Sequence, residues 1–188
     1  MLSIGQNKEQ RILAQFARGG QHAMDMLYAT YADYLTGVAA RYLRQPDDLH
    51  DVLQEALIKV FTSINSFEYR GRGSLKAWLT KVVVNEALIF LRQSRRLGYT
   101  DIDALPDIPE EEPPDTSGLS PEQAKALIDQ LPDGYRTVFN LYAIEGRSHK
   151  EIAQMLHIKP DTSASQYHRA KNMLARLIRQ RQDKQATR

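Results

Sequence analysis

The sequence contains no cysteine, which excludes disulfide bonds, thiolate nucleophiles and cysteine-ligated zinc sites. No apolar run approaches the ~20 residues that a membrane-spanning helix needs. Residues 1–11 lack the apolar core of a secretory signal. Together these absences favour a soluble protein of a reducing compartment. We therefore expect a cytoplasmic location without membrane insertion.

One stretch of the chain lacks positive charge altogether. Residues 99–121 contain no Lys or Arg and 7 Asp or Glu, whereas residues 1–98 have a formal charge of +4 and residues 122–188 one of +5. Two basic blocks beside an acidic connector suit a polyanionic partner such as nucleic acid. Soluble domains are often mildly basic without such a partner, so charge alone leaves both interpretations open.

The acidic stretch also has the composition of an interdomain linker. Five of the 8 prolines lie within residues 99–121, together with three consecutive glutamates. Proline lacks a backbone donor and like charges repel each other, so this stretch is expected to be extended. The sequence predicts two small domains, residues 1–98 and 120–188, joined by an acidic, proline-rich linker over residues 99–119.

Apolar residues on both sides of the linker recur at three- and four-residue spacing and almost nowhere alternate, which predicts an all-α fold. Ser74 is predicted to be the N-cap of one helix, and Ser120 and Ser148 open capping boxes of two others. The helices expected in the first domain cover about residues 7–18, 21–44, 47–64 and 74–96. Those expected in the second domain cover about residues 121–130, 133–144 and 148–155, with a final helix from about residue 161.

Residues 148–171 have the pattern of a helix-turn-helix, in which a second helix enters the DNA major groove. Ile152, Ala153 and Leu156 share one face of the first helix, and the small Ala153 permits a close helix crossing. His157 stands where the turn needs a positive φ, a conformation that glycine usually provides and histidine tolerates. The second helix carries donors that suit bases and phosphates. A plain helical hairpin with a solvated polar face is the alternative interpretation.

Four segments together resemble the conserved segments of bacterial sigma factors, in order and in spacing. Residues 51–61, D-V-L-Q-E-A-L-I-K-V-F, are similar to the family's acidic D-L-V-Q-E-x-F helix, and residues 74–87 to the F-x-x-W-L-x-x-I-A-x-N-x-A segment that follows it. Residues 131–139 resemble its L-P-x-x-x-R-x-V-F segment, and residues 151–171 its E-I-A and T-V-x-S-R-x-x-R-A-R stretches. The chain thus resembles an extracytoplasmic-function (ECF) sigma factor, the group 4 type of the sigma-70 family that keeps only conserved regions 2 and 4.

The resemblance implies a factor that binds core RNA polymerase and directs promoter-specific transcription initiation, with no cofactor and no enzymatic activity of its own. Residues 1–98 would form a region 2-like domain that binds the polymerase and the downstream promoter element. Residues 120–188 would form a region 4-like domain that binds the upstream element. The family also implies a further partner, an anti-sigma protein that holds such factors inactive.

In the family, the helix that corresponds to residues 47–64 docks on a coiled coil of the largest catalytic subunit of the polymerase. An ordinary solvated helix face is the alternative interpretation. The residues expected to make the polymerase contact are Asp51, Gln54, Glu55 and Ile58. The apolar residues of the same helix that are expected to be buried are Leu49, Val52, Leu53, Ala56, Leu57, Val60 and Phe61.

The loop over residues 65–73 and the helix after it resemble the part of the family that melts and reads the downstream element. Capturing an unstacked base needs a stacking surface and a closely approaching backbone, which Phe67 and two nearby glycines suit. Trp78 is expected in the core rather than as a stacking platform. The residues expected to contact the downstream element are Tyr69, Arg70, Arg72, Ser74, Lys76, Lys81, Asn85, Arg92, Arg95 and Arg96.

In the second domain, the final helix is expected to touch the upstream element. Gln166 would suit adenine, and Arg169 would suit guanine or phosphate. Ser163, Ala164 and Gln166 stand where the family commonly has valine and two basic residues, so the sequence does not reveal the promoter that is recognised. The residues expected at this contact are Asp161, Thr162, Ala164, Ser165, Gln166, His168, Arg169 and Lys171.

Two other classes of function compete with this interpretation. A stand-alone helix-turn-helix regulator would explain residues 120–188, but it would leave the first domain without a role and would usually bind as a dimer. An enzyme would need a catalytic site, for which His149, His157 and His168 with Glu151 suggest a metal. The sequence lacks H-E-x-x-H, cysteine ligands and a P-loop pattern. No catalytic residue and no metal site are therefore expected.

Overall fold

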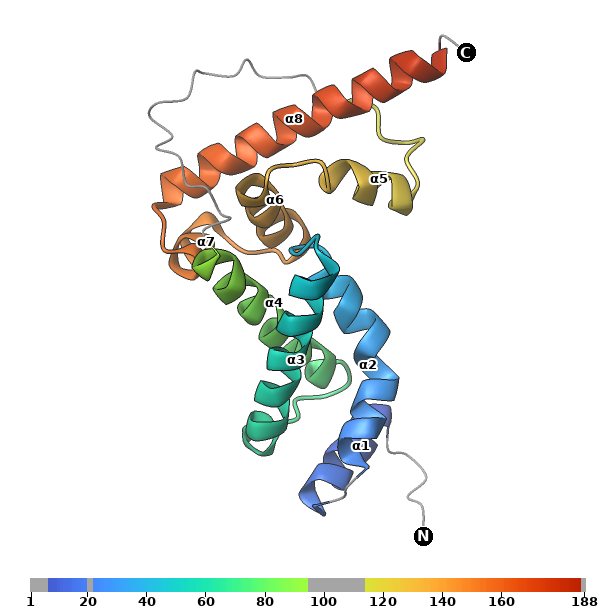
Figure 1. The fold of residues 1–188 in the computed structure, drawn as a ribbon, viewed down its shortest axis with the longest axis vertical. Coiled ribbons are helices and arrows are strands. Elements are labelled where there is room, and N and C mark those ends of the chain that lie inside the picture. Colours follow the sequence, from blue (N-terminus) through green and yellow to red (C-terminus); the bar gives the residue numbers. More distant parts are fainter. Residues whose placement is uncertain (1–6, 20–21, 95–113, 187–188) are drawn as a thin grey trace. The chain divides into compact units, whose positions relative to one another are not determined.

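The computed structural model describes residues 7–19, 22–94 and 114–186 of the chain. All regular structure within these ranges is helical, which confirms the all-α prediction (Figure 1). The chain divides into two compact units, Met1–Phe90 and Leu91–Arg188. The domain boundary predicted at residue 98 and most of the predicted linker lie outside the described residues.

The first unit holds the four helices that the apolar spacing predicted, the last of which ends three residues past its boundary. They are α1 (Lys8–Ala17), α2 (Ala23–Ala39), α3 (Pro46–Ser63), which continues into the short 3-10 turn η1 (Ile64–Ser66), and α4 (Ser74–Gln93). Asn7 caps α1 through a capping box with Gln10, and Gly19 follows the helix with a φ of 65°. Proline at the first position of α3 starts that helix without losing a needed hydrogen bond.

The core of the first unit forms where α1, α2 and α3 pack together and α4 adds the buried residues Leu75, Leu79 and Val83. On α3 the prediction is confirmed for three residues at four-residue spacing, Val52, Ala56 and Val60, each at most 3% exposed. It is wrong for Phe61, which is 59% exposed. Leu49, Leu53 and Leu57 are half-buried. Phe61 continues the row of Leu53 and Leu57 along the edge of the buried stripe, where the helix surface turns toward solvent.

The second unit consists of α5 (Pro121–Ile128), α6 (Asp133–Phe139), the π-helical turn η3 (Asn140–Ile144), α7 (His149–Leu156) and α8 (Pro160–Ala186). In this unit α5, α6 and α7 all pack against the long α8 (Figure 1). The capping boxes predicted at Ser120 and Ser148 are present. The single helix predicted for residues 133–144 is wrong in one respect, because its last part has π-helical rather than α-helical geometry.

The turn between α7 and α8 has the backbone geometry that the helix-turn-helix pattern predicted. His157 ends α7 with φ 58° and ψ 44°, the left-handed conformation. It is the one non-glycine residue with positive φ in the part of the chain that the structure describes. Ile152, Ala153 and Leu156 are buried, at 0%, 6% and 1% exposure. A histidine can therefore occupy this position while α7 keeps its apolar face against α8.

Candidate partner and nucleic-acid interfaces

The four residues predicted to bind a partner protein lie together on one exposed face of α3. Asp51, Gln54, Glu55 and Ile58 are all exposed, and their spacing of three and four residues places them along adjacent turns. Ile58 is 50% exposed. The α3 face therefore presents two carboxylates and an amide around an apolar centre, which suits a partner surface that is basic and partly apolar.

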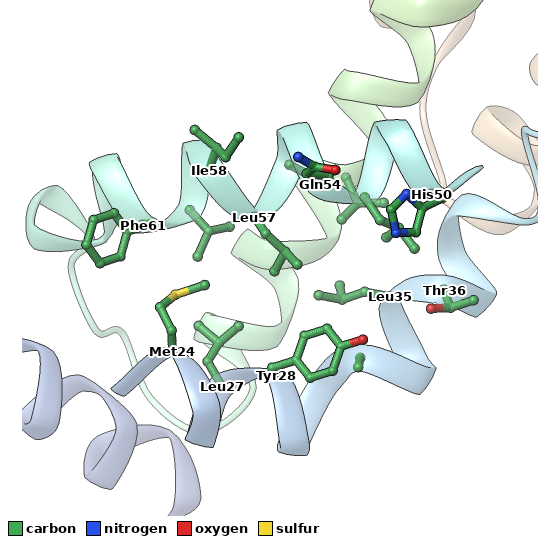
Figure 2. A pocket seen from close by; sticks show the side chains of 15 residues that line it. Met24, Leu27, Tyr28, Leu35, Thr36, His50, Gln54, Leu57, Ile58 and Phe61 are labelled. Atoms are coloured by element: carbon green, nitrogen blue, oxygen red, sulfur yellow. The ribbon is translucent and has the colours of Figure 1, made fainter. Parts of the chain in front are cut away.

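An apolar groove runs beside the α3 face, between α2 and α3, and has a volume of about 400 Å³. Gln54 and Ile58 line it, and Figure 2 shows side chains of both helices converging on it. Tyr28 and Phe61 stand at the groove with 58% and 59% of their surface exposed. Exposed apolar patches of this kind mark protein interaction surfaces. Sequence reasoning missed Tyr28 as a candidate, since helical spacing alone does not distinguish an edge position from a core position.

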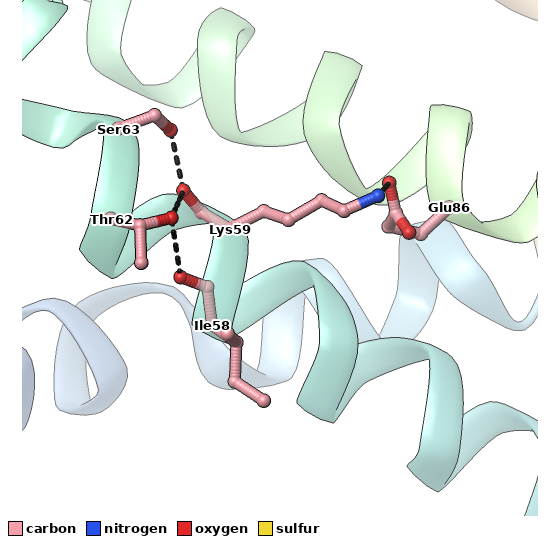
Figure 3. Close-up of polar contacts among 5 residues, drawn as sticks. All are labelled: Ile58, Lys59, Thr62, Ser63 and Glu86. Carbon is pink, nitrogen blue, oxygen red and sulfur yellow. Dashed lines mark hydrogen bonds and ion pairs between the residues drawn. The ribbon is translucent and has the colours of Figure 1, made fainter.

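An ion pair joins the helix that carries this face to α4. The Lys59 ammonium lies 2.7 Å from a carboxylate oxygen of Glu86, whose side chain is only 10% exposed (Figure 3). The hydroxyls of Thr62 and Ser63 donate to the backbone carbonyl of Lys59. These are back-bonds to a carbonyl inside the helix. Independently of them, the ammonium of Lys59 ties α3 to α4.

The loop before α4 depends on two glycines on either side of an exposed arginine. Gly71 and Gly73 have φ values of 113° and 93°, a conformation that residues with a Cβ rarely adopt. Arg72 lies between them and is exposed. Arg70 is also exposed and pairs with Glu68 at 3.2 Å. The loop therefore presents two guanidinium groups to solvent on a backbone that only this glycine pattern allows.

Ser74 does not cap α4, so that prediction is wrong. Ser74 is the first helical residue; its hydroxyl donates to the carbonyl of Gly71, 2.7 Å away, and accepts from the Arg70 N–H at 3.2 Å. The cap comes from Glu9 in α1, whose carboxylate accepts the backbone N–H groups of Gly73 at 2.9 Å and Lys76 at 3.2 Å. A serine before an apolar run looks like an N-cap in sequence, but here the loop itself uses its hydroxyl.

Glu9 is buried, at 6% exposure, and has a third donor. The hydroxyl of Tyr31 in α2 donates to it at 3.2 Å. Burial, together with the negative charge of Glu9 and this hydrogen bond, raises the pKa of Tyr31 to about 12. Sequence reasoning missed Glu9, because a glutamate in the first turn of α1 is already explained by the dipole of its own helix.

Aromatic and polar contacts support the loop from other sides. Phe67 and Trp78 pack with ring centroids 5.2 Å apart and planes tilted by 43°. Both are half-buried, so Trp78 contributes to packing, as expected, but is not fully enclosed. At the other side of the loop, the amide nitrogen of Asn7 donates to the Tyr69 hydroxyl at 2.7 Å. Tyr69 is therefore held by the residue that caps α1.

The remaining residues predicted for the downstream element lie along α4. The Lys76 ammonium stands 3.9 Å from the centre of the Tyr34 ring, a cation–π contact. Lys81 and Asn85 are exposed and four residues apart, so they share one face. Arg92 lies in the last turn of the helix. The other two candidates, Arg95 and Arg96, lie outside the described residues.

The helix-turn-helix is fixed at its start by an aromatic cluster. The Tyr142 ring stacks on His149 at 4.4 Å and meets Tyr167 of α8 at the same distance. The Nδ1 atom of His149 lies 2.9 Å from the Ser163 hydroxyl, so α7 and α8 are joined by a hydrogen bond. Burial lowers the pKa of His149, which favours the neutral ring in this packed position.

The residues predicted to contact the upstream element divide between two faces of α8. Asp161, Ala164 and Lys171 are exposed, and Thr162, Ser165 and His168 are half-buried. Gln166 and Arg169 are only 3% and 8% exposed. The structure therefore brings six of the eight candidates to accessible positions and places the side chains of Gln166 and Arg169 on the buried face. Helical spacing did not reveal this difference, because the whole helix is rich in polar residues.

Neither a cluster of metal-ligating side chains nor a long apolar helix occurs in the described part of the chain. Among residues 7–19, 22–94 and 114–186, no three His, Asp or Glu side chains gather as a metal site would require. Each helix in those ranges is too short or too polar to cross a bilayer.

A helical chain whose second unit presents a helix-turn-helix belongs to the class of DNA-binding proteins. Comparison with known proteins defines the family within that class. Residues 27–97 match the family described as Sigma-70 region 2, and residues 121–174 match Sigma-70 region 4. The chain is 29% identical to the ECF RNA polymerase sigma-E factor of Haemophilus influenzae, over 90% of this chain and 95% of that protein. It is 28% identical to the RNA polymerase sigma-H factor of Pseudomonas aeruginosa, over 93% and 96%.

The chain also resembles a chain in a solved structure of CnrH in complex with the cytosolic domain of CnrY. The two share 23% sequence identity with a TM-score of 0.49, and the match covers 92% of this chain and 97% of the chain in that structure. The two family matches and the curated relatives agree with the motif pattern over both units. The chain belongs to the sigma-70 family, in its extracytoplasmic-function group, and it is a sigma factor that directs transcription initiation.

Proposed function

We propose that the α3 face and the groove beside it form the surface on which this sigma factor binds core RNA polymerase. The observation that carries the proposal is the continuity of the two features, since Gln54 and Ile58 belong to both. Large apolar side chains remain exposed there, at 50% for Ile58 and 59% for Phe61. Burying that apolar area in a complex supplies affinity, while the flanking carboxylates of Asp51 and Glu55 favour a basic partner.

Promoter recognition is divided between the two units in this proposal. The first unit melts and reads the downstream element through the loop that ends at Gly73 and through the exposed side chains of α4. Arg70 and Arg72 are exposed and suit the phosphates of a displaced strand. The residues that take part on α4 and in the loop are Tyr69, Ser74, Lys76, Lys81, Asn85 and Arg92, together with Arg95 and Arg96 beyond the described helix.

The second unit reads the upstream element through α8. In this proposal the accessible residues at the start of that helix, Thr162 and Ser165 among them, contact base edges, and Lys171 contacts a phosphate. The burial of Gln166 and Arg169 changes the roles predicted for them. In our proposal these two residues hold the recognition helix in position and do not contact bases directly.

The factor acts in the cytoplasm and has no catalytic activity of its own in this proposal. An anti-sigma protein is a further proposed partner, for which the exposed groove is a suitable surface. An apolar groove of about 400 Å³ favours association with some protein whenever polymerase does not cover it.

Transcription of double-stranded genomic fragments by sigma-free bacterial core polymerase tests this function. The 5′ ends of the transcripts are mapped with and without the purified protein. We expect discrete start sites that depend on the protein, each preceded by two shared elements about one and a half to two helical turns apart. The shared elements would also identify the promoter sequence.

Active core polymerase that gains no new start sites from the folded protein would contradict the proposal. A stable dimer that binds duplex DNA without polymerase would then favour a stand-alone regulator.

A further inference from the structure

We infer that α1 is a positioning element of the site that opens the promoter, through Glu9 and Asn7. This helix lies outside the segment that matches Sigma-70 region 2, which begins at residue 27. It nevertheless contacts the segment from Tyr69 to Lys76 at three points. The inference rests on the proposed role of that segment in reading the downstream element.

The carboxylate of Glu9 is the group that closes the start of α4. The first N–H groups of a helix have no partner within the helix, and Glu9 accepts those of Gly73 and Lys76. A negative charge at this end of the helix is also favoured by the helix dipole. Because the Ser74 hydroxyl is used by the loop, Glu9 provides the side-chain cap that α4 does not supply itself.

Burial makes this cap specific to a carboxylate. Glu9 is 6% exposed and accepts three donors, two through Oε1 and one through Oε2. An amide in its place would present an NH₂ group to one of those donors, leaving an N–H group buried without an acceptor. The isosteric change Glu9→Gln therefore weakens the cap, by removing its charge and at least one of its hydrogen bonds, while keeping the shape of the side chain.

Asn7 holds the other end of the same segment. Its carbonyl oxygen accepts the N–H of Gln10 at 3.0 Å and so caps α1, while its amide nitrogen donates to the Tyr69 hydroxyl at 2.7 Å. One side chain thus ties the start of α1 to Tyr69, the first residue of that segment. Two residues at the start of α1, its cap Asn7 and Glu9, thus fix both ends of the segment that carries Arg70 and Arg72.

Two fixed ends reduce the number of conformations available to the exposed arginines between them. Capturing an unstacked base from a duplex is more favourable when the receiving loop does not have to be ordered at the same time. α1 therefore acts before DNA arrives, by holding the backbone at Gly73 in the conformation with φ of 93°. Glu9 and Asn7 are positioning residues in this inference, and neither is required to touch DNA.

The test compares Glu9→Gln with the wild-type protein in complex with core polymerase. A charge-matched control is Glu122→Gln, which also removes a carboxylate from the first turn of a helix. Three quantities are measured: affinity for core polymerase, the rate of promoter opening on duplex DNA and the amide hydrogen exchange of residues 70–76 in the free protein. The promoter is one mapped in the transcription experiment.

For Glu9→Gln we expect unchanged core affinity, promoter opening slowed by about tenfold and exchange at Gly73 and Lys76 faster by about tenfold, from the loss of buried charge-assisted hydrogen bonds. Glu122→Gln should match the wild type in all three. Opening and exchange at wild-type rates in Glu9→Gln would overturn the inference. Faster exchange with normal opening would also overturn it, since loosening the loop would then have no effect on promoter opening.

Asn7→Ser provides a second variant that does not depend on the buried carboxylate. Serine can still cap α1 but cannot reach Tyr69, so we expect slower opening by a few fold with α1 intact. A wild-type opening rate in this variant would remove Asn7 from the inference. If the wild-type protein itself supports no transcription, the proposed function has failed, whereas the exchange comparison still decides whether α1 holds the loop.

Discussion

The side-chain carboxylate of Glu9 accepts a hydrogen bond from the backbone N–H of Gly73 over 2.9 Å, although 64 residues separate the two in the chain. The same carboxylate accepts the Tyr31 hydroxyl. Three elements, α1, α2 and the start of α4, therefore meet at one buried charge. A helix cap supplied by another helix makes the loop before α4 depend on tertiary packing, so changes at this point should be measurable in both stability and pH dependence.

The pH dependence of unfolding should reveal Tyr31. Its pKa is raised from 10.0 to about 12 by burial and by Glu9, so the neutral phenol is favoured in the folded state. The resulting stability is fully present below about pH 10, the unfolded pKa of tyrosine, and is lost as the pH rises toward 12. We expect the free energy of unfolding to fall more steeply over this window in the wild type than in Tyr31→Phe. Parallel pH profiles for the two proteins would contradict the assignment.

Alanine at Gly73 should destabilise the first unit through backbone strain. A Cβ there would meet nothing within 4 Å, but the φ of 93° is one that alanine rarely adopts. We expect a loss of about 1–2 kcal/mol in the free energy of unfolding. The matched control is Gly37→Ala inside α2, where a Cβ also meets nothing within 4 Å and helix propensity predicts a gain of about 0.5–1 kcal/mol. Chemical denaturation of both variants distinguishes strain from a general effect of the added methyl group.

Reversing the charge of the α3 face should weaken polymerase binding without unfolding the protein. Asp51→Arg combined with Glu55→Arg places two cations where the proposal requires carboxylates, and both positions are exposed. We expect the affinity for core polymerase to fall by about tenfold or more, because like charges across an interface repel. The melting temperature should stay close to that of the wild type. An unchanged affinity would remove the α3 face from the proposed docking surface.

Alanine substitutions at Lys171 and Arg169 should affect different properties, although the two residues lie only two positions apart on α8. Lys171 is exposed, so Lys171→Ala should weaken binding to every DNA sequence and lower the salt slope of binding by about 1. Arg169 is 8% exposed, so Arg169→Ala should mainly reduce the free energy of unfolding, by about 2 kcal/mol. A loss of affinity confined to one base position in Arg169→Ala, with normal stability, would show instead that Arg169 reads DNA.

Local chemistry was sufficient for much of the fold. The spacing of apolar residues predicted the helices of both units, and the capping boxes at Ser120 and Ser148 predicted where two of them begin. The left-handed turn at His157 followed from the helix-turn-helix pattern. These features depend on residues within a few positions of one another, which is the range over which backbone preferences and side-chain caps act.

Other features were settled by tertiary packing and could not be predicted from spacing. Phe61 continues an apolar row yet is exposed, because the neighbouring helix α2 leaves a groove beside it. Gln166 and Arg169 have the chemistry of base-reading residues yet are buried. Ser74 has the position of an N-cap, but Glu9 takes that role from another helix. Spacing along one helix indicates which side chains share a face. Only the packing of several helices decides which face is covered, and which distant group accepts hydrogen bonds from the unpaired N–H groups at a helix end.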